Sequence, residues 1–171
     1  MNERNKLMID FETLDTRPTS VAFSLGVCAF NLTGILSSGY RNISIEEGIQ
    51  TGGTISESTL KFWMDMPELF KELTKSPISI SETIEWLNDA VVGFDVDELW
   101  CNGAAFDFPI LDRYVGISQI TPKWNFRQLM DYRTLKNVFH KILRPVNKHL
   151  HHPEQDAIHQ ARHLIEIYNE K

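Results

Sequence analysis

Cysteine and long apolar runs are both scarce in this chain. Only two of its 171 residues are cysteine, Cys28 and Cys101, and both stand inside apolar runs typical of strands. This placement favours small buried side chains over a disulfide framework or a metal knuckle. No stretch approaches the roughly 18 consecutive apolar residues that a membrane helix needs. The N-terminal residues "MNERNK" lack the apolar core of a signal peptide. We therefore expect a cytoplasmic protein without a membrane segment.

Internal repeats, low-complexity tracts and Pro- or Ser-rich linkers are absent as well. Hydrophobic residues make up 42% of the chain and charged residues 23%, which is ordinary for a globular protein. A chain of this length suffices for one compact domain with a sizeable core. The sequence therefore predicts a single domain over residues 1–171.

The formal net charge of −6 argues at first against a polyanionic partner, but its distribution matters more. Between Lys123 and Lys148 the chain carries seven basic residues and one acid, Asp131. The basic residues are Lys123, Arg127, Arg133, Lys136, Lys141, Arg144 and Lys148. Such a run is often only a solvated face, and it is weak evidence for phosphate binding. It does remove the objection that the net charge raises against nucleic acid.

The hydrophobic pattern predicts three strands followed by alternating helices and strands. Strand-like runs cover residues 6–12, 20–31 and 35–44, with turn signals between them. Further strands are predicted over 98–103 and 126–130, and helices over 57–66, 82–93, 105–116, 131–140 and 154–168. Ser56 and Ser81 are the expected N-caps of the first two helices. This order indicates an α/β fold with a mixed central sheet flanked by helices.

Acidic residues stand where the predicted elements end or begin. In "KLMIDFETLDT", Asp10 and Glu12 are one residue apart, so both point to one face of the first strand. Asp107 follows the fourth strand, and Asp156 begins the last helix. Sites in open α/β sheets collect at such positions. Converging carboxylates repel one another unless cations bind them, and Mg²⁺ or Mn²⁺ prefers carboxylate oxygens. Two such ions suit an in-line displacement at phosphorus.

Three segments carry a resemblance to a known family. "IDFETLDT" resembles an Asp-x-Glu motif, "CNGAAFDFPIL" an Asn-x-x-x-Phe-Asp motif, and "HHPEQDAIHQA" a His-x₄-Asp motif. Together and in this order they resemble the DEDDh 3′→5′ exonucleases of the ribonuclease H-like superfamily. The short length, "STLKFW" and "MDYRTL" are most similar to the phage-type exonuclease A (DexA) and bacterial exoribonuclease subgroup.

The resemblance implies a role for each motif residue. Asp10, Glu12, Asp107 and Asp156 would hold two Mg²⁺ ions, for which Mn²⁺ can substitute, and His151 would take the proton of the attacking water. Imidazole exchanges protons near neutral pH, which suits a general base. Substrate contacts are implied for Thr13, Leu14, Asn102 and Phe106. The first motif continues "TLDT" where many members have Thr-Thr-Gly, which puts the shape of the nucleotide pocket in question.

The implied activity is hydrolysis of single-stranded nucleic acid from a free 3′ end to nucleoside 5′-monophosphates. DNA is slightly favoured over RNA as the substrate. A homodimer is an open alternative to a monomer, because relatives form dimers. One alternative is an exoribonuclease or oligonucleotide-processing enzyme with the same site, and another is a nucleic-acid-binding module without catalysis. The complete carboxylate set favours catalysis over the binding module.

Further alternatives concern the histidines and tryptophans. Five of the six histidines, His149, His151, His152, His159 and His163, follow residue 148. A zinc site is disfavoured because no cysteine cluster accompanies them. His159 and His163 are expected to face solvent, and His152 competes with His151 for the role of base. The four tryptophans are expected in the core, with Trp63 the one to test for base stacking.

Overall fold

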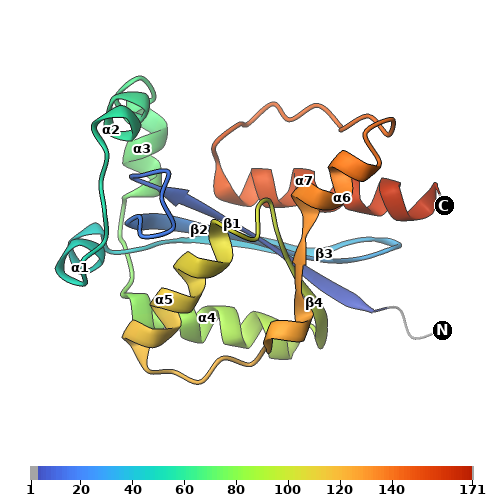
Figure 1. The fold of residues 1–171 in the computed structure, drawn as a ribbon, viewed down its shortest axis with the longest axis horizontal. Coiled ribbons are helices and arrows are strands. Elements are labelled where there is room, and N and C mark those ends of the chain that lie inside the picture. The colour runs from blue at the N-terminus through green and yellow to red at the C-terminus, as the bar shows by residue number, and fades with distance from the viewer. Residues whose placement is uncertain (1–3, 171) are drawn as a thin grey trace.

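The computed structural model describes residues 4–170 and places five strands in one mixed sheet (Figure 1). The order across the sheet is β3-β2-β1-β4-β5. The central strand β1 (Asn5–Thr13) pairs antiparallel with β2 (Ala22–Asn31) and parallel with β4 (Val96–Cys101). The edge strands are β3 (Gly34–Asn42), antiparallel to β2, and β5 (Leu129–Asp131), parallel to β4. The predicted α/β fold with a mixed sheet is confirmed.

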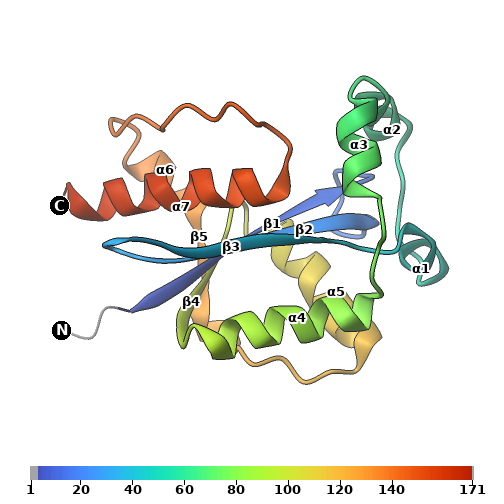
Figure 2. The same ribbon diagram turned by 180° about the vertical axis from the view of Figure 1, so that it is seen from behind.

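Helices cover both faces of the sheet. They are α1 (Ile45–Gln50), α2 (Glu57–Met64), α3 (Pro67–Leu73), α4 (Ile80–Gly93), α5 (Asp107–Ser118), α6 (Tyr132–Val138) and α7 (Pro153–Asn169). A 3₁₀ turn, Phe126–Gln128, precedes β5. Helix α7 lies over one face, whereas α4 and α5 cover the other (Figures 1 and 2). Among residues 4–170, no helix combines the length and the apolar character that crossing a membrane requires.

The predicted elements match the observed ones except at four places. Ser56 caps α2 as expected, since its hydroxyl accepts a hydrogen bond from the Thr59 amide. The predicted cap Ser81 is wrong, because α4 begins two residues earlier, after Ser79. Ser79 and Glu82 form a capping box, in which each side chain bonds the other residue's backbone N–H, and this leaves Ser81 inside the first turn. The short helices α1 and α3 were not predicted, and part of the strand predicted over 126–130 is the 3₁₀ turn.

Both cysteines and two of the tryptophans are buried, as the sequence indicated. Cys28 and Cys101 are free thiols inside the protein. Trp63 of α2 is 2% exposed and donates from its indole Nε1 to the Thr13 carbonyl oxygen at 2.9 Å, so it packs in the core. Trp100 is 4% exposed, whereas Trp86 and Trp124 are partly buried against the core.

Small residues let α7 approach the sheet closely. Ala157 and Ala161 are fully buried and pack against Met8 and Cys28 of the sheet. At Gly26, opposite Asp10 in β2, a Cβ atom would overlap the backbone of Pro153, the first residue of α7. Glycine at this position therefore sets the distance between the sheet and the helix turn that carries Asp156.

Gly26→Ala should destabilise the protein and shift the start of α7. Inserting a methyl group against a backbone costs at least the ~1–3 kcal/mol of ordinary overpacking. Gly116→Ala is the matched control, because no atom other than its chain neighbours and the adjacent backbone of α5 lies within 4 Å of its Cβ position. Alanine in a helix is more stable than glycine by roughly 0.5–1 kcal/mol, so this control should be neutral or stabilising. Thermal unfolding of both variants measures the difference, and equal melting temperatures would contradict the packing argument.

Candidate active site

Asp10 and Glu12 lie near the C-terminal end of β1, on the face that α7 covers (Figure 1). Met8, two residues earlier on the same face, packs against the buried alanines of α7. Gln160 of α7 donates from Nε2 to Asp10 Oδ1 at 2.7 Å. The predicted alternation along β1 therefore holds, and it presents both carboxylates to the helix.

Asp107 reaches the same region from the segment after β4. Cys101 pairs with Ile9 of β1, so residues 102–106 leave the sheet beside Asp10. Asp107 begins α5 and is 5% exposed, and its Oδ1 accepts a hydrogen bond from the Phe11 amide at 3.4 Å. A third carboxylate is thus held by the backbone of β1 itself.

Asp156 stands in the first turn of α7 and binds the loop that precedes the helix. Its Oδ1 accepts a hydrogen bond from the Asn147 side chain, and its Oδ2 accepts one from the His151 amide at 2.9 Å. His151 has a left-handed backbone with φ of 66°, an uncommon conformation for a residue other than glycine. Ligand-type atoms of Glu12, His151 and Asp156 all lie within 4.8 Å of one another.

Two clefts meet at these groups. One, of about 610 Å³, is lined among others by Asp10, Glu12, Asn102, His151 and Asp156. The other, of about 690 Å³, shares Glu12 and His151 and adds the aromatic rings of Phe11, Phe62, Trp63 and Phe106. Glu12 and His151 therefore lie at the junction of an acidic cleft and an aromatic one.

The four carboxylates are electrostatically unfavourable as they stand. Burial, and then repulsion from the neighbouring acids, raises the pKa of Asp10 and of Glu12 well above their ordinary values. Burial raises the pKa of Asp107 to about 7, although the Phe11 amide and Arg133 oppose it, and burial also raises the pKa of Asp156. In the described part of the chain, no lysine or arginine forms an ion pair with any of the four. The cluster requires protons or an added cation to offset its charge.

The residues predicted to bind substrate differ in how much surface they offer. Phe106 lines the aromatic cleft with Thr13, whose hydroxyl donates to the Asp15 carbonyl oxygen at 2.8 Å. Leu14 is 2% exposed and packs with the core residues around Trp63, so its side chain adds little to the cleft surface. Asn102 lines the acidic cleft, where its side-chain oxygen accepts a hydrogen bond from Lys136 at 3.0 Å. Substrate contact by these four residues stays a prediction.

Sequence reasoning missed three side chains at the site. Phe62 is 41% exposed, and its ring centroid lies 4.9 Å from that of His151 in an edge-on arrangement. Gln160 and Asn147 orient Asp10 and Asp156 as neutral donors. The position of Gln160, one helical turn after Asp156, is the only signal that could have indicated it. Nothing in the sequence around Asn147 indicates a role.

The prediction that His159 and His163 face solvent is wrong for His163. His163 is 1% exposed and lies within hydrogen-bond distance of the Tyr132 hydroxyl, at 2.7 Å, and of the Ile142 carbonyl oxygen, at 3.1 Å. His159 is partly buried, and its Nε2 contacts the Pro145 carbonyl oxygen. His152 turns away from the clefts toward Tyr40, with ring centroids 4.7 Å apart. In both His159 and His163, the Nε2 atom thus contacts a backbone carbonyl oxygen.

Asp131, the one acid between Lys123 and Lys148, is the N-cap of α6. Its Oδ1 accepts hydrogen bonds from the Ala104 and Arg133 amides, both at 3.2 Å, and its Oδ2 accepts one from the Thr134 hydroxyl at 2.6 Å. Partial burial would raise its pKa, but these bonds prevail and lower it. Asp131 therefore caps α6 and ties it to the segment that leads to Asp107.

The basic segment, residues 123–148, has basic side chains at both ends of the sheet. Arg133 lines the aromatic cleft and Arg144 the acidic one. Lys123 precedes the 3₁₀ turn and Arg127 lies within it, where Gln128 bonds the carbonyl oxygen of Val96 at the start of β4. This is the opposite end of β4 from the carboxylates, so only part of the basic segment borders the site.

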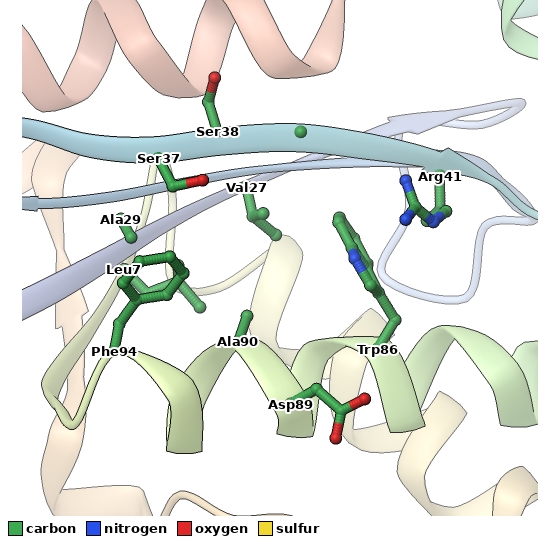
Figure 3. Close-up of a pocket in the computed structure, with 11 residues that line it drawn as sticks. Leu7, Val27, Ala29, Ser37, Ser38, Arg41, Trp86, Asp89, Ala90 and Phe94 are labelled. Carbon is green, nitrogen blue, oxygen red and sulfur yellow. The ribbon is translucent and has the colours of Figure 1, made fainter.

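A further hollow, of about 310 Å³, lies on the opposite side of the sheet, between β3 and α4 (Figure 3). Small side chains such as Val27, Ala29 and Ala90 line it, and the Arg41 guanidinium lies over Trp86 at 4.8 Å from the ring centroid. Its one acid is Asp89. This hollow offers none of the paired acids that distinguish the α7 face.

The raised pKa values predict how pH affects the metal-free protein. A folded state whose carboxyls have raised pKa values holds protons that the unfolded state releases, so stability falls as pH rises through about 7. In chelator, the melting temperature should be lower at about pH 8 than at about pH 6, and Mg²⁺ should raise it more at pH 8. Asp107→Asn should reduce this pH dependence, whereas exposed Asp112→Asn in the same helix should not. A melting temperature that rises from pH 6 to pH 8 in chelator would contradict the burial argument.

Comparison with known proteins identifies the family and the fold. The model of a family described as "3'-5' exoribonuclease Rv2179c-like domain" matches residues 5–168. An exodeoxyribonuclease of Enterobacteria phage T4 is 29% identical, over 61% of this chain and 52% of the relative. The chain therefore spans about half the length of this curated relative.

Solved nuclease structures share the fold. The nuclease domain of 3'hExo, a DEDDh family member solved with rAMP, superposes with a TM-score of 0.73 at 12% identity, covering 99% of this chain and 94% of that one. Exonuclease X, solved with 5′-overhanging duplex DNA, gives a TM-score of 0.65 at 14% identity, over 97% and 92%. The ribonuclease H-like fold and the resemblance to DEDDh nucleases are confirmed. Because the family model matches residues 5–168 of this chain, the chain belongs to the Rv2179c-like 3′-5′ exoribonuclease domain family.

Proposed function

We propose that this protein is a metal-dependent 3′→5′ exonuclease, formed by one domain over residues 1–171. It hydrolyses single-stranded nucleic acid from a free 3′ end and releases nucleoside 5′-monophosphates. The observation that carries the proposal is the convergence of Asp10, Glu12, Asp107 and Asp156 from three elements onto one partly buried site beside His151. Family membership supports the same reaction class.

The donor set fits hard divalent cations. Carboxylate oxygens are the preferred ligands of Mg²⁺ and Mn²⁺, and burial together with mutual repulsion raises the pKa values of these acids. We assign two Mg²⁺ ions to Asp10, Glu12, Asp107 and Asp156, with Mn²⁺ able to substitute. Bound ions supply positive charge that offsets the negative charge developing around the phosphorus. The neutral donors Gln160 and Asn147 orient the carboxylates without cancelling the charge that attracts cations.

His151 is the proposed general base. Its ring lies at the junction of the two clefts, and its backbone amide is bound by Asp156. A ring nitrogen takes the proton from the water that attacks the terminal phosphodiester. The bond from phosphorus to the 3′-oxygen then breaks, and that oxygen receives a proton as the new 3′ end. General-base catalysis of this kind typically contributes about 10²–10⁴-fold.

The aromatic cleft is the proposed place of the terminal nucleotide. The exposed ring of Phe62 and the partly buried ring of Phe106 offer apolar surface to a base next to Glu12. Thr13, Leu14 and Asn102 complete the contacts that the family resemblance implies. The family is described as an exoribonuclease and the phage relative as an exodeoxyribonuclease, so the two differ in the sugar of the nucleic acid. We keep the slight preference for DNA as our proposal, with RNA as the alternative and a homodimer as a further one.

The proposal predicts digestion from the 3′ end that requires a divalent metal. With 3′- or 5′-labelled single-stranded DNA and RNA in parallel, Mg²⁺ or Mn²⁺ should yield nucleoside 5′-monophosphates. Chelator should stop the reaction, and Asp10→Asn should abolish it because a metal ligand is removed. Asp112→Asn, an exposed acid of α5, is the charge-matched control and should be fully active. Undiminished digestion in excess chelator, or cleavage of a closed circle, would contradict the proposal.

His151→Ala should reduce the turnover number by about 10²–10⁴-fold, the usual contribution of a general base. Binding of Mn²⁺, measured by calorimetry, should remain close to that of the parent because the carboxylates are unchanged. His152→Ala is the neighbouring control and should keep most activity, since its ring packs on Tyr40 away from both clefts. An inactive His152→Ala beside an active His151→Ala would place the base one residue later.

The positions of the basic residues predict which lysine and arginine side chains bind the single-stranded nucleic acid. Arg133→Gln with Arg144→Gln removes two charges beside the clefts, whereas Lys123→Gln with Arg127→Gln removes two at the opposite end of β4. Removing one cation that binds a phosphate should lower the slope of log affinity against log salt by about 0.7 for a single strand. The first pair should therefore lower the slope by about 1.4 and the second leave it unchanged. The slopes are measured in chelator by fluorescence anisotropy. If the two double variants show equal slopes, the nucleic acid binds elsewhere on the protein.

A further inference from the structure

The loop between α6 and α7, residues 139–152, carries His151 but has little apolar packing of its own. Three of its large side chains, Leu143, Val146 and Leu150, are 84%, 85% and 61% exposed. No regular helix or strand forms within it. A 14-residue loop without a buried apolar face must be held by a small number of polar contacts.

One face of α7 supplies such contacts along much of the loop, and His152 adds one to Glu72 at 3.6 Å. Asp156, His159 and His163 are spaced three and four residues apart, so they follow one another along the helix. Asp156 holds Asn147 and the His151 amide, His159 contacts the Pro145 carbonyl oxygen, and His163 reaches the Ile142 carbonyl oxygen at 3.1 Å. The loop is thus attached to the helix at successive points from Ile142 to His151.

His163 is the buried end of this row. The Ile142 carbonyl can only accept a hydrogen bond, so His163 Nε2 must donate to it. A neutral imidazole that donates from Nε2 accepts at Nδ1, and the Tyr132 hydroxyl donates there at 2.7 Å. Tyr132 is fully buried, and burial raises its pKa to about 12, which keeps the hydroxyl protonated. Tyr132 therefore selects the tautomer of His163 that binds the loop.

We propose that His163, oriented by Tyr132, is a positioning residue that holds the loop so that His151 faces Glu12 and Asp156. It acts on the reaction only through the loop, because its own ring lies in the core. This inference rests on the proposed exonuclease activity and the role of His151 in it. A misplacement of about 1 Å at a catalytic group can cost about 10²-fold in rate, so loosening the loop should lower turnover.

The expected result is a rate loss that depends on His151. His163→Leu should lower turnover by about 10- to 100-fold, and His163→Gln should recover part of it because its amide can donate to the Ile142 carbonyl. In the His151→Ala background the same His163→Leu change should have no further effect, since the base it positions is absent. A purely structural role would lower activity equally in both backgrounds.

Further measurements separate the alternatives. His140→Leu, an exposed histidine in the same loop, is the matched control and should be as active as the parent. Hydrogen exchange at the amides of residues 143–151 should be faster in His163→Leu than in the parent, with the sheet amides unchanged. An active parent with an equally active His163→Leu variant, or an additive loss in the His151→Ala background, would overturn the positioning role. A parent that digests no nucleic acid would overturn the proposed function itself, and the role of His163 with it.

Discussion

The confinement of four carboxylates in one partly buried site is the constraint on which the structure depends. Asp10, Glu12, Asp107 and Asp156 come from β1, α5 and α7, and burial with mutual repulsion raises the pKa values of Asp10 and Glu12. The elements that hold these acids together must be stabilised elsewhere, by the apolar layers on both faces of the sheet. The donors that touch the acids include backbone amides, the side-chain amides of Gln160 and Asn147, and the Cys101 thiol beside Asp107. They fix the directions of the Asp10, Asp107 and Asp156 carboxylates while the charge of each remains available to a cation.

The close packing of α7 follows from the same constraint. Asp156 can approach Asp10 only if the helix lies almost against the sheet, and the glycine and alanine residues at the contact permit this. Gly26 lies where the helix begins, and Ala157 and Ala161 continue the contact along it. Larger apolar side chains at these positions would increase the buried area and separate the acids. At this interface, small side chains bury less apolar area than longer ones would, but they allow the close approach of α7 that brings the acids together.

The sequence predicts best what local chemistry determines. Alternation along β1 was sufficient to place Asp10 and Glu12 on one face, and the motifs indicated the five residues to which the proposed chemistry is assigned. The errors concern partners that are distant in the chain. Gln160 contacts Asp10 across 150 residues, and His163 is buried only because Tyr132 and Ile142 lie beside it. No local pattern distinguishes such a histidine from a solvent-exposed one. The cap at Ser81 failed for another reason, because two serines stood near the helix start and only Ser79 has Glu82 three residues later.

The backbone of His151 connects the proposed base to the acidic cluster. A left-handed conformation at a residue other than glycine costs on the order of 1–3 kcal/mol and persists only where the surroundings fix it. Here the fixing bond runs from the His151 amide to Asp156, one of the four carboxylates. The strength of that bond depends on the charge of Asp156, because a hydrogen bond to an ionised carboxylate is stronger than one to a neutral acid. Protonation of the cluster therefore weakens the hold on His151, and full ionisation strengthens it. The ionised state that can attract cations is thus also the state in which the proposed base is held most firmly.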